Sequence, residues 1–284
     1  MEDSITIGFS NNIYNNPADV LDTVRIISTH FRAIEIELAE DAQITVFDAA
    51  PDEYAQIITA FRNMAAERSL EYSVHAAWFG PHTDLTARDT EERRASVALL
   101  ARSLRFASDI GARIVTTHPG SHHDQNEKQL VSALAKSLRE TVDIVAAPRV
   151  LLCVENMGSQ RPSQTVLNAE AQIEICKLVG VGICLDIVHL ASVVSETTAL
   201  LGAVEALAPF TRHVHLGDTI RPRHRHLPIG RGDLPLAAII ERLAGVGYRG
   251  HAIVEEWNRG WSPEEYLAGA LAFRQRMQAS GLVV

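Results

Sequence analysis

Short apolar runs recur along the chain, and amphipathic stretches of helical length separate them. The runs are rich in β-branched residues, which is typical of buried strands. We expect strands over Ile5–Ser10, Ala33–Leu38, Glu71–Ala76, Arg113–His118, Val150–Glu155, Val181–Asp186, Arg212–Gly217 and His251–Glu256. Apolar residues at 3.6-residue spacing predict helices over Asp52–Ser69, Thr90–Ile110, Glu127–Val145, Ala169–Leu178, Thr198–Leu207 and Pro235–Gly245.

This alternation predicts the fold class. A strand, a helix and a further strand in succession favour parallel pairing through a right-handed crossover. Eight such units in 284 residues indicate an α/β protein with one closed (β/α)8 TIM barrel, and a doubly wound open sheet is the lesser alternative. No linker rich in proline, glycine or serine divides the sequence, so we expect a single domain over residues 1–284.

Composition and charge narrow the class of protein. Hydrophobic residues make up 46% of the chain and charged residues 21%, which is typical of a globular protein. Apolar runs fall well short of the roughly 18–20 residues that span a bilayer, and Met1–Ser4 lacks the basic start of a signal peptide. We therefore expect a cytoplasmic protein without membrane contact. A net charge of −9 repels polyanions, which favours a small-molecule substrate over nucleic acid.

The cysteines and histidines of the chain differ in what they indicate. Cys153, Cys176 and Cys184 stand singly in apolar surroundings, so we expect buried free thiols rather than disulfides or a cysteine zinc site. The chain has twelve histidines, a high count. Their positions decide whether they are scattered over the surface or gathered in a site.

Histidines and carboxylates follow the predicted strands at one end. In a (β/α)8 enzyme the active site is built from the C-terminal ends of the strands and the loops after them. Six strands have such a residue within two positions of their C-terminal end, and three more histidines lie in the segments that follow: His75, His118, Glu155, Asp186, His215 and Glu255, then His189, His224 and His226. Any one of them alone is as well explained by packing, but their convergence on one rim predicts a functional site.

Imidazole and carboxylate together are the ligands of divalent zinc, manganese, cobalt, iron or magnesium. Four consecutive strands supply one potential set of ligands: Glu155, Asp186, His215 and Glu255. His75 and His118 can hold a second ion bridged through Glu155, and His189, His224 and His226 can hold a third. Because extra histidines also serve as substrate contacts or proton carriers, we expect one to three ions per chain. No GxGxxG motif or P-loop indicates a nucleotide cofactor.

Further polar and aromatic residues lie near this rim. We expect substrate contacts from His122, Arg221, Arg223 and Trp257. His213 shares the inward face of its strand with His215, one layer deeper, and is expected to make a supporting hydrogen bond. Glu35 and Glu37 share one face of the second strand. Unpaired buried carboxylates are costly, so we expect a polar partner there, either substrate or arginine.

The motifs at the ends of the predicted strands, taken together and in their order along the chain, resemble those of the superfamily of xylose-isomerase-like TIM barrels. That superfamily includes sugar phosphate isomerases and epimerases and the AP endonuclease family 2 typified by endonuclease IV. The resemblance covers essentially the whole chain and rests on Ser73–Ala76, His118–His122, Val154–Met157, Gly182–His189, His213–Asp218, His226–Asp233 and Ile253–Glu256.

The two branches of the superfamily imply different sites. The isomerases and epimerases would carry one ion on the positions matching Glu155, Asp186, His215 and Glu255, with Glu155 and Glu255 as the acid/base pair. The endonuclease-like members would use the same four residues, His75, His118, His189 and two loop ligands for three zinc ions. Here His224 takes the place of a loop aspartate, which leaves the third position with less negative charge.

The leading expectation is therefore an isomerase or epimerase of a small sugar, sugar phosphate or polyol. A metal would stabilise an enediolate, Glu155 or Glu255 would remove a proton and the other would return it, and His189 with a loop arginine would hold substrate oxygens. The alternative is a multinuclear metallohydrolase of a phosphate ester or another small-molecule bond, favoured by nine candidate ligands, or a metal-dependent lyase. A metal-binding scaffold without activity has least support. A homo-oligomer is compatible with the sequence, since such barrels frequently pair through outer helices.

Overall fold

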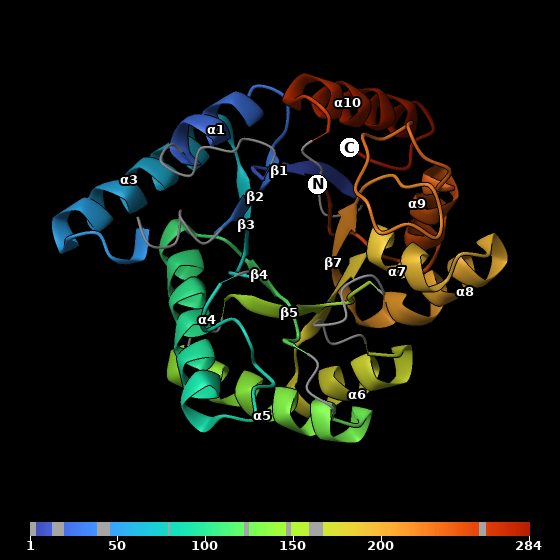
Figure 1. Ribbon diagram of the computed structural model, residues 1–284. Helices are drawn as coiled ribbons and strands as arrows, with labels where there is room; N and C mark the ends of the chain where they lie inside the picture. The colour runs from blue at the N-terminus through green and yellow to red at the C-terminus, as the bar shows by residue number, and fades with distance from the viewer. Residues whose placement is uncertain are drawn as a thin grey trace.

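Eight parallel strands close into a barrel in the order of the chain (Figure 1). The computed structural model describes residues 4–12, 20–38, 46–78, 80–121, 125–145, 149–158, 167–255 and 260–284. The strands are β1 (Thr6–Ser10), β2 (Ala33–Glu37), β3 (Glu71–His75), β4 (Ile114–Thr117), β5 (Leu151–Glu155), β6 (Gly182–Asp186), β7 (Thr211–Leu216) and β8 (His251–Val254). β1 pairs with β2 and also with β8, which excludes the open sheet and confirms the predicted barrel.

The helices form a ring outside the strands (Figure 1). They are α1 (Val20–Ile27), α3 (Pro51–Arg68), α4 (Thr90–Ile110), α5 (Glu127–Val145), α6 (Ala169–Val179), α7 (Ile187–Val193), α8 (Thr197–Leu207), α9 (Leu236–Gly245) and α10 (Pro263–Ala279), with a short 3₁₀ turn at Ala208–Phe210. All six predicted helices are present with ends within one residue of the prediction, and the predicted strands agree within two residues. Helices α1, α7 and α10 were not expected from the sequence.

The hydrophobic core lies between the strands and the helices. Alternate strand residues point outward to the helices, and on β2, β5 and β6 these include the fully or almost fully buried Ile34, Ile36, Leu152, Ile183 and Leu185. Phe61 and Phe106 of α3 and α4 pack edge to face, with ring centroids 5.7 Å apart. This outer layer holds the barrel together and leaves the opposite strand faces free to carry polar groups.

The inward faces of the strands carry small or apolar side chains in places, and polar side chains towards the C-terminal ends of the strands. Gly8 lies against β2 and β8 so closely that a Cβ atom there would be 2.5 Å from the carbonyl oxygen of Ala33. Cys153 and Cys184 are fully buried, and all three cysteines are free thiols, as predicted. Glu35, His75 and His215 are equally buried on inward positions nearer the rim. A buried polar layer of this kind requires specific partners, which the site supplies.

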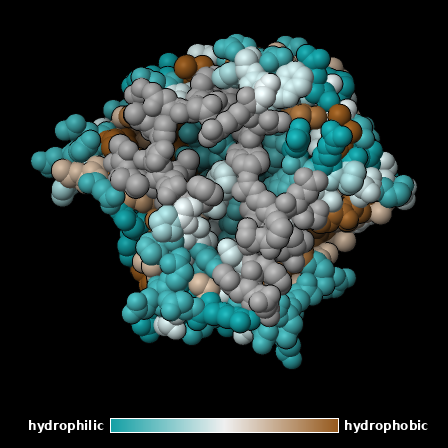
Figure 2. All heavy atoms as spheres, viewed as in Figure 1, coloured by the Kyte–Doolittle hydropathy of each residue, from teal (hydrophilic) through white to brown (hydrophobic). Residues whose placement is uncertain are grey.

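The outer surface carries mainly hydrophilic side chains around the helical ring, with hydrophobic ones scattered among them (Figure 2). Within the described ranges, no helix combines the length and the apolar character needed to cross a membrane.

Candidate metal centre

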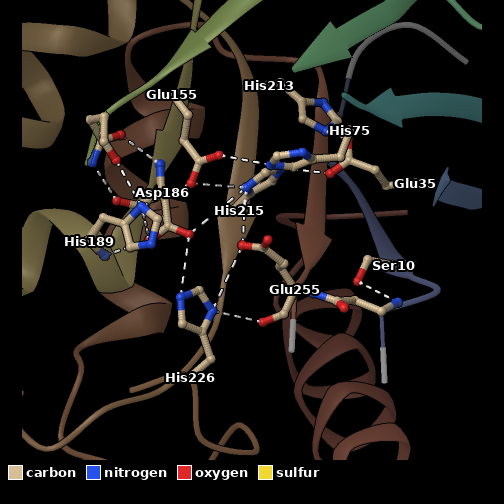
Figure 3. Close-up of polar contacts among 12 residues, drawn as sticks. Ser10, Glu35, His75, Glu155, Asp186, His189, His213, His215, His226 and Glu255 are labelled. Carbon is tan, nitrogen blue, oxygen red and sulfur yellow. Dashed lines mark hydrogen bonds and ion pairs between the residues drawn. The ribbon is translucent and has the colours of Figure 1, made fainter. Parts of the chain in front are cut away.

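Six strands bring ligand-type side chains to the same end of the barrel. His75, Glu155 and Asp186 are the last residues of β3, β5 and β6, and His215 is the last but one of β7. His118 and Glu255 directly follow β4 and β8. Except for His118, which is partly exposed, these side chains are at most 7% exposed. The structure thus brings together the rim residues that the sequence predicted, and most of them meet in one view (Figure 3).

Four of these residues, Glu155, Asp186, His215 and Glu255, form what we call the four-ligand site. His215 Nδ1 lies 3.2 Å from Glu255 Oε2, 3.7 Å from Glu155 Oε1 and 3.9 Å from Asp186 Oδ2. All four atoms are buried and none makes a hydrogen bond of good geometry, although His189 Nδ1 also lies 2.9 Å from Glu155 Oε1. Buried polar atoms without partners are costly, while three carboxylates and an imidazole facing one centre are the donor set of a divalent cation. The residues present therefore fit a metal ion here.

A second group, the bridging cluster, contains His75, His118 and Glu155. The Nε2 atoms of His75 and His118 lie 3.1 and 3.3 Å from the same oxygen, Glu155 Oε2. His75 Nδ1 donates to the carbonyl of Ala76 at 2.7 Å, which turns Nε2 towards the cluster. The two oxygens of Glu155 thus face two different groups of ligands, an arrangement in which a carboxylate can bridge two ions.

A third group, the three-histidine cluster, contains His189, His224 and His226. Their ligand atoms lie within 4.8 Å of one another, and the rings of His189 and His224 are 4.4 Å apart. Asp186 connects this cluster to the four-ligand site, because its Oδ1 accepts a hydrogen bond from the His189 backbone at 2.5 Å and so caps α7. The three ligands are uncharged when they bind a metal, so this cluster would leave the charge of an ion uncompensated.

The loop that carries His224 and His226 is held by Asp218. This buried carboxylate accepts hydrogen bonds from the backbone N–H groups of Thr219, Gly230, Gly232 and Leu234 at 2.8–3.2 Å. A Cβ atom on Gly232 would lie 2.2 Å from Asp218 Oδ1, so the contact requires glycine. The sequence analysis gave Asp218 no role, because its partners are backbone groups that a residue pattern does not reveal.

Burial and charge pairing oppose each other throughout the centre. Burial would raise the pKa of Glu155, but His118, His215 and His189 hold it well below its ordinary value. Burial would likewise raise the pKa of Glu255, but the nearby His215 lowers this pKa to about 2. Burial would lower the pKa of His75, yet Glu155 raises it to about 10. In the metal-free protein, protonated imidazoles therefore provide the positive charge that these carboxylates require.

Glu35 lies one layer below the four-ligand site, between two histidines. Its Oε1 is 2.7 Å from His215 Nε2, and its Oε2 accepts a hydrogen bond from His213 Nε2 at 2.7 Å. The partner of Glu35 is therefore neither the substrate nor an arginine, the two alternatives expected from sequence. His213 makes the supporting hydrogen bond expected of it, and it does so through Glu35.

Glu37, two residues further along β2, has no hydrogen-bond partner for either carboxylate oxygen. Burial, and next the nearby charge of Glu255, raise its pKa to about 8. This carboxyl group is therefore largely protonated at neutral pH in the metal-free protein.

The residues predicted to contact the substrate differ in where the structure places them. The Arg221 side chain donates to Asp233 Oδ1, the Ser195 carbonyl and Thr197 Oγ1 at 2.8–3.1 Å, so its guanidinium group ties the loop to the start of α8. Arg223 is exposed on the same loop, next to His224. His122 and Trp257 lie outside the described residues. Of the two arginines, Arg223 is thus the better candidate for a substrate contact.

The family of the chain agrees with this architecture. The model of the xylose isomerase-like TIM barrels matches residues 25–277. The chain belongs to this family, as the motifs predicted.

The relatives of this chain include proteins named as endonucleases and one named as an epimerase. A "Probable endonuclease 4" from Oleidesulfovibrio alaskensis is 33% identical over 210 residues, which cover 66% of this chain and 70% of that protein. An "L-ribulose-5-phosphate 3-epimerase UlaE" from Salmonella paratyphi B is 23% identical over 93% of this chain and 92% of its own length. Six further curated relatives are matched over 58–66% of their length. A solved D-tagatose 3-epimerase-like protein superimposes with a TM-score of 0.80 at 20% identity, over 97% of this chain and 98% of that one, which shows a shared fold.

One expectation from the composition needs correction. The net charge led us to expect a small-molecule substrate rather than nucleic acid, and the relative named as an endonuclease contradicts that expectation. Net charge does not report the charge at the mouth of the barrel. The loop after β7 carries four arginines, at positions 221, 223, 225 and 231.

The Asp218 contact can be tested by Asp218→Ala. The substitution leaves four backbone N–H groups without their acceptor, and each unsatisfied buried donor costs about 1–3 kcal/mol. We expect the free energy of unfolding, measured in urea, to fall by more than about 2 kcal/mol, and zinc bound by the three-histidine cluster to be lost. Asp143→Ala, on the exposed side of α5, is the control. Unchanged zinc content in the Asp218 variant would show that the contact does not organise the loop.

The raised pKa of Glu37 predicts how stability depends on pH. The folded protein holds this proton more tightly than the unfolded chain, whose carboxyl titrates near 4.5. The stabilisation is complete below pH 4.5 and is lost as the pH rises towards 8. Urea unfolding of chelator-treated protein should therefore show a steeper loss between about pH 5 and pH 8 in the wild type than in Glu37→Gln. His75, His215, Glu35 and Glu255 face Glu37 in both proteins, so parallel curves would refute the raised pKa.

Proposed function

We propose that the protein is a divalent-metal-dependent hydrolase of phosphate esters that binds ions at the four-ligand site, the bridging cluster and the three-histidine cluster. The observation that carries this proposal is the sharing of Glu155, which offers one oxygen to His215 and the other to His75 and His118. An isomerase of this family needs the four-ligand site alone. It could use His189 as a substrate contact, but it would not need two further complete groups of histidines placed against the same carboxylates.

Each residue has a role in this proposal. Divalent ions held by the three groups of ligands would supply the Lewis acidity that activates water and neutralises charge on the ester oxygens. Glu155 and Asp186 hold the clusters in a fixed relation, because each contacts residues of two groups. The burial of both carboxylates excludes bulk water, so the charges act in a medium of low dielectric constant.

The substrate class follows from the charge around the three-histidine cluster. Its neutral ligands favour an anionic group beside them, and Arg223 and Arg225 flank His224 with exposed side chains. Arginine is well suited to phosphate because its planar guanidinium can donate two parallel hydrogen bonds. Phosphodiesters of nucleic acid and small phosphate esters both belong to this class.

The second candidate is an epimerase or isomerase of a sugar phosphate. Glu155 Oε1 and Glu255 Oε2 both face His215 Nδ1, at 3.7 and 3.2 Å, as the two members of an acid/base pair would. The nearly full-length match to a relative named as a ribulose-phosphate epimerase favours the same candidate. In this reaction one glutamate would remove a proton from carbon and the other would return it.

The double variant His224→Ala/His226→Ala separates the two candidates. For the hydrolase, we expect about three ions in the wild type, about one fewer in the variant, and a loss of phosphodiesterase activity of more than about 100-fold. Elemental analysis gives the metal content. Bis(4-nitrophenyl) phosphate and duplex DNA with an abasic site serve as hydrolysis probes, and L-ribulose 5-phosphate in deuterated water serves as the epimerisation probe. His82→Ala, which removes an exposed histidine paired with Glu92, is the control.

The contrary result is equally specific. A protein that binds about one ion, exchanges solvent deuterium into the ketose phosphate and keeps this activity in the double variant would be the epimerase. That result would refute the hydrolase proposal.

A further inference from the structure

The contact between Glu35 and His215 crosses the interior of the barrel. Glu35 lies on β2 and His215 on β7, two strands that are not neighbours in the sheet. Both side chains, and that of His213, are fully buried. Figure 3 shows Glu35 beside the rings of His213 and His215, on the side away from Asp186. The two carboxylate oxygens are each 2.7 Å from one imidazole Nε2 atom.

This contact decides which nitrogen of His215 can bind an ion. A ligating nitrogen must offer a lone pair, so a neutral imidazole must carry its proton on the other nitrogen. The Glu35 carboxylate accepts hydrogen bonds and therefore favours the proton on Nε2 of His215. Nδ1 is then left with its lone pair, and Nδ1 is the atom that faces Glu155, Asp186 and Glu255.

His213 keeps Glu35 in this position. It donates from Nε2 to the second carboxylate oxygen, so each oxygen of Glu35 lies 2.7 Å from one imidazole and the group cannot rotate without losing a contact.

Other histidines of the centre are supported differently. His75 Nδ1 lies 2.7 Å from the Ala76 carbonyl, and His226 Nδ1 lies 3.1 Å from the Glu255 carbonyl. These acceptors are neutral, whereas the acceptor behind His215 carries a full negative charge. A charged acceptor makes the imidazole a stronger electron donor to a metal ion.

We propose that Glu35, held by His213, is a positioning residue that fixes Nδ1 of His215 as the ligand and strengthens ion binding at the four-ligand site alone. The inference rests on the metal sites of the proposed function and not on its reaction. It applies equally to a hydrolase and to an epimerase, because both would use His215.

The test is a titration of chelator-treated protein with Co²⁺, in competition with a chromophoric chelator. Glu35→Gln keeps the shape of the side chain and removes its charge. We expect the affinity of one ion, that of the four-ligand site, to fall about 10–100-fold, with the other ions unaffected. The visible absorption of Co²⁺ at this site should also change, because the orientation of His215 is no longer fixed. Glu35→Asp, which keeps the charge, should recover part of the affinity.

The chain offers a matched control. Outside the centre, the partly exposed Glu92 Oε2 lies 2.9 Å from His82 Nδ1, a pair of the same chemistry. Glu92→Gln should leave every Co²⁺ affinity unchanged. Wild-type affinities and an unchanged spectrum in Glu35→Gln would overturn the inference. An equal loss of all ions would also overturn it, because that pattern indicates a general structural role. Wild-type protein that bound no Co²⁺ would instead refute the proposed metal centre itself.

Discussion

The carboxylate of Glu155 is the group on which the centre depends. It is almost completely buried, and three histidines from other elements approach its oxygens within 3.3 Å. A buried carboxylate is stable only when positive charge surrounds it. The imidazoles of His75 and His189, whose pKa values are raised, meet that requirement in the metal-free protein, and metal ions would meet it in the loaded one. The need to compensate buried negative charge thus links the stability of the barrel interior to metal binding.

The fold tolerates this concentration of charge because it separates the apolar packing outside the barrel from the polar packing inside it. The outward strand faces and the helices form the hydrophobic core, so the inward faces need not be apolar. Closure of the barrel then brings β2 opposite β7 and β3 near β7, which places Glu35 behind His215 and the ring of His75 5.6 Å from that of His215. Six strands bring a ligand-type group to the rim, and the loop after β7 adds His224 and His226. An open sheet would spread the same residues along a line.

Much of this could be predicted from the sequence, for a physical reason. The alternation of strands and helices is a local property, and in a barrel the ends of strands meet wherever they lie in the chain, so His75, Glu155 and His215 could be placed on one rim. Contacts between particular atoms could not be predicted in the same way. Glu35 and His213 are 178 residues apart, and only barrel closure joins them. Asp218 binds backbone groups, and Arg221 is held by Asp233, so residue type alone suggested the wrong partner or none.

The most direct test of this account is X-ray diffraction from zinc-loaded crystals, with data on both sides of the zinc absorption edge. Anomalous scattering locates each ion independently of any assumption about ligands. The account predicts separate peaks beside His215 Nδ1, between His75 and His118 next to Glu155 Oε2, and within the three-histidine cluster. A single peak at the four-ligand site, with the other two clusters free of anomalous signal under zinc excess, would contradict it.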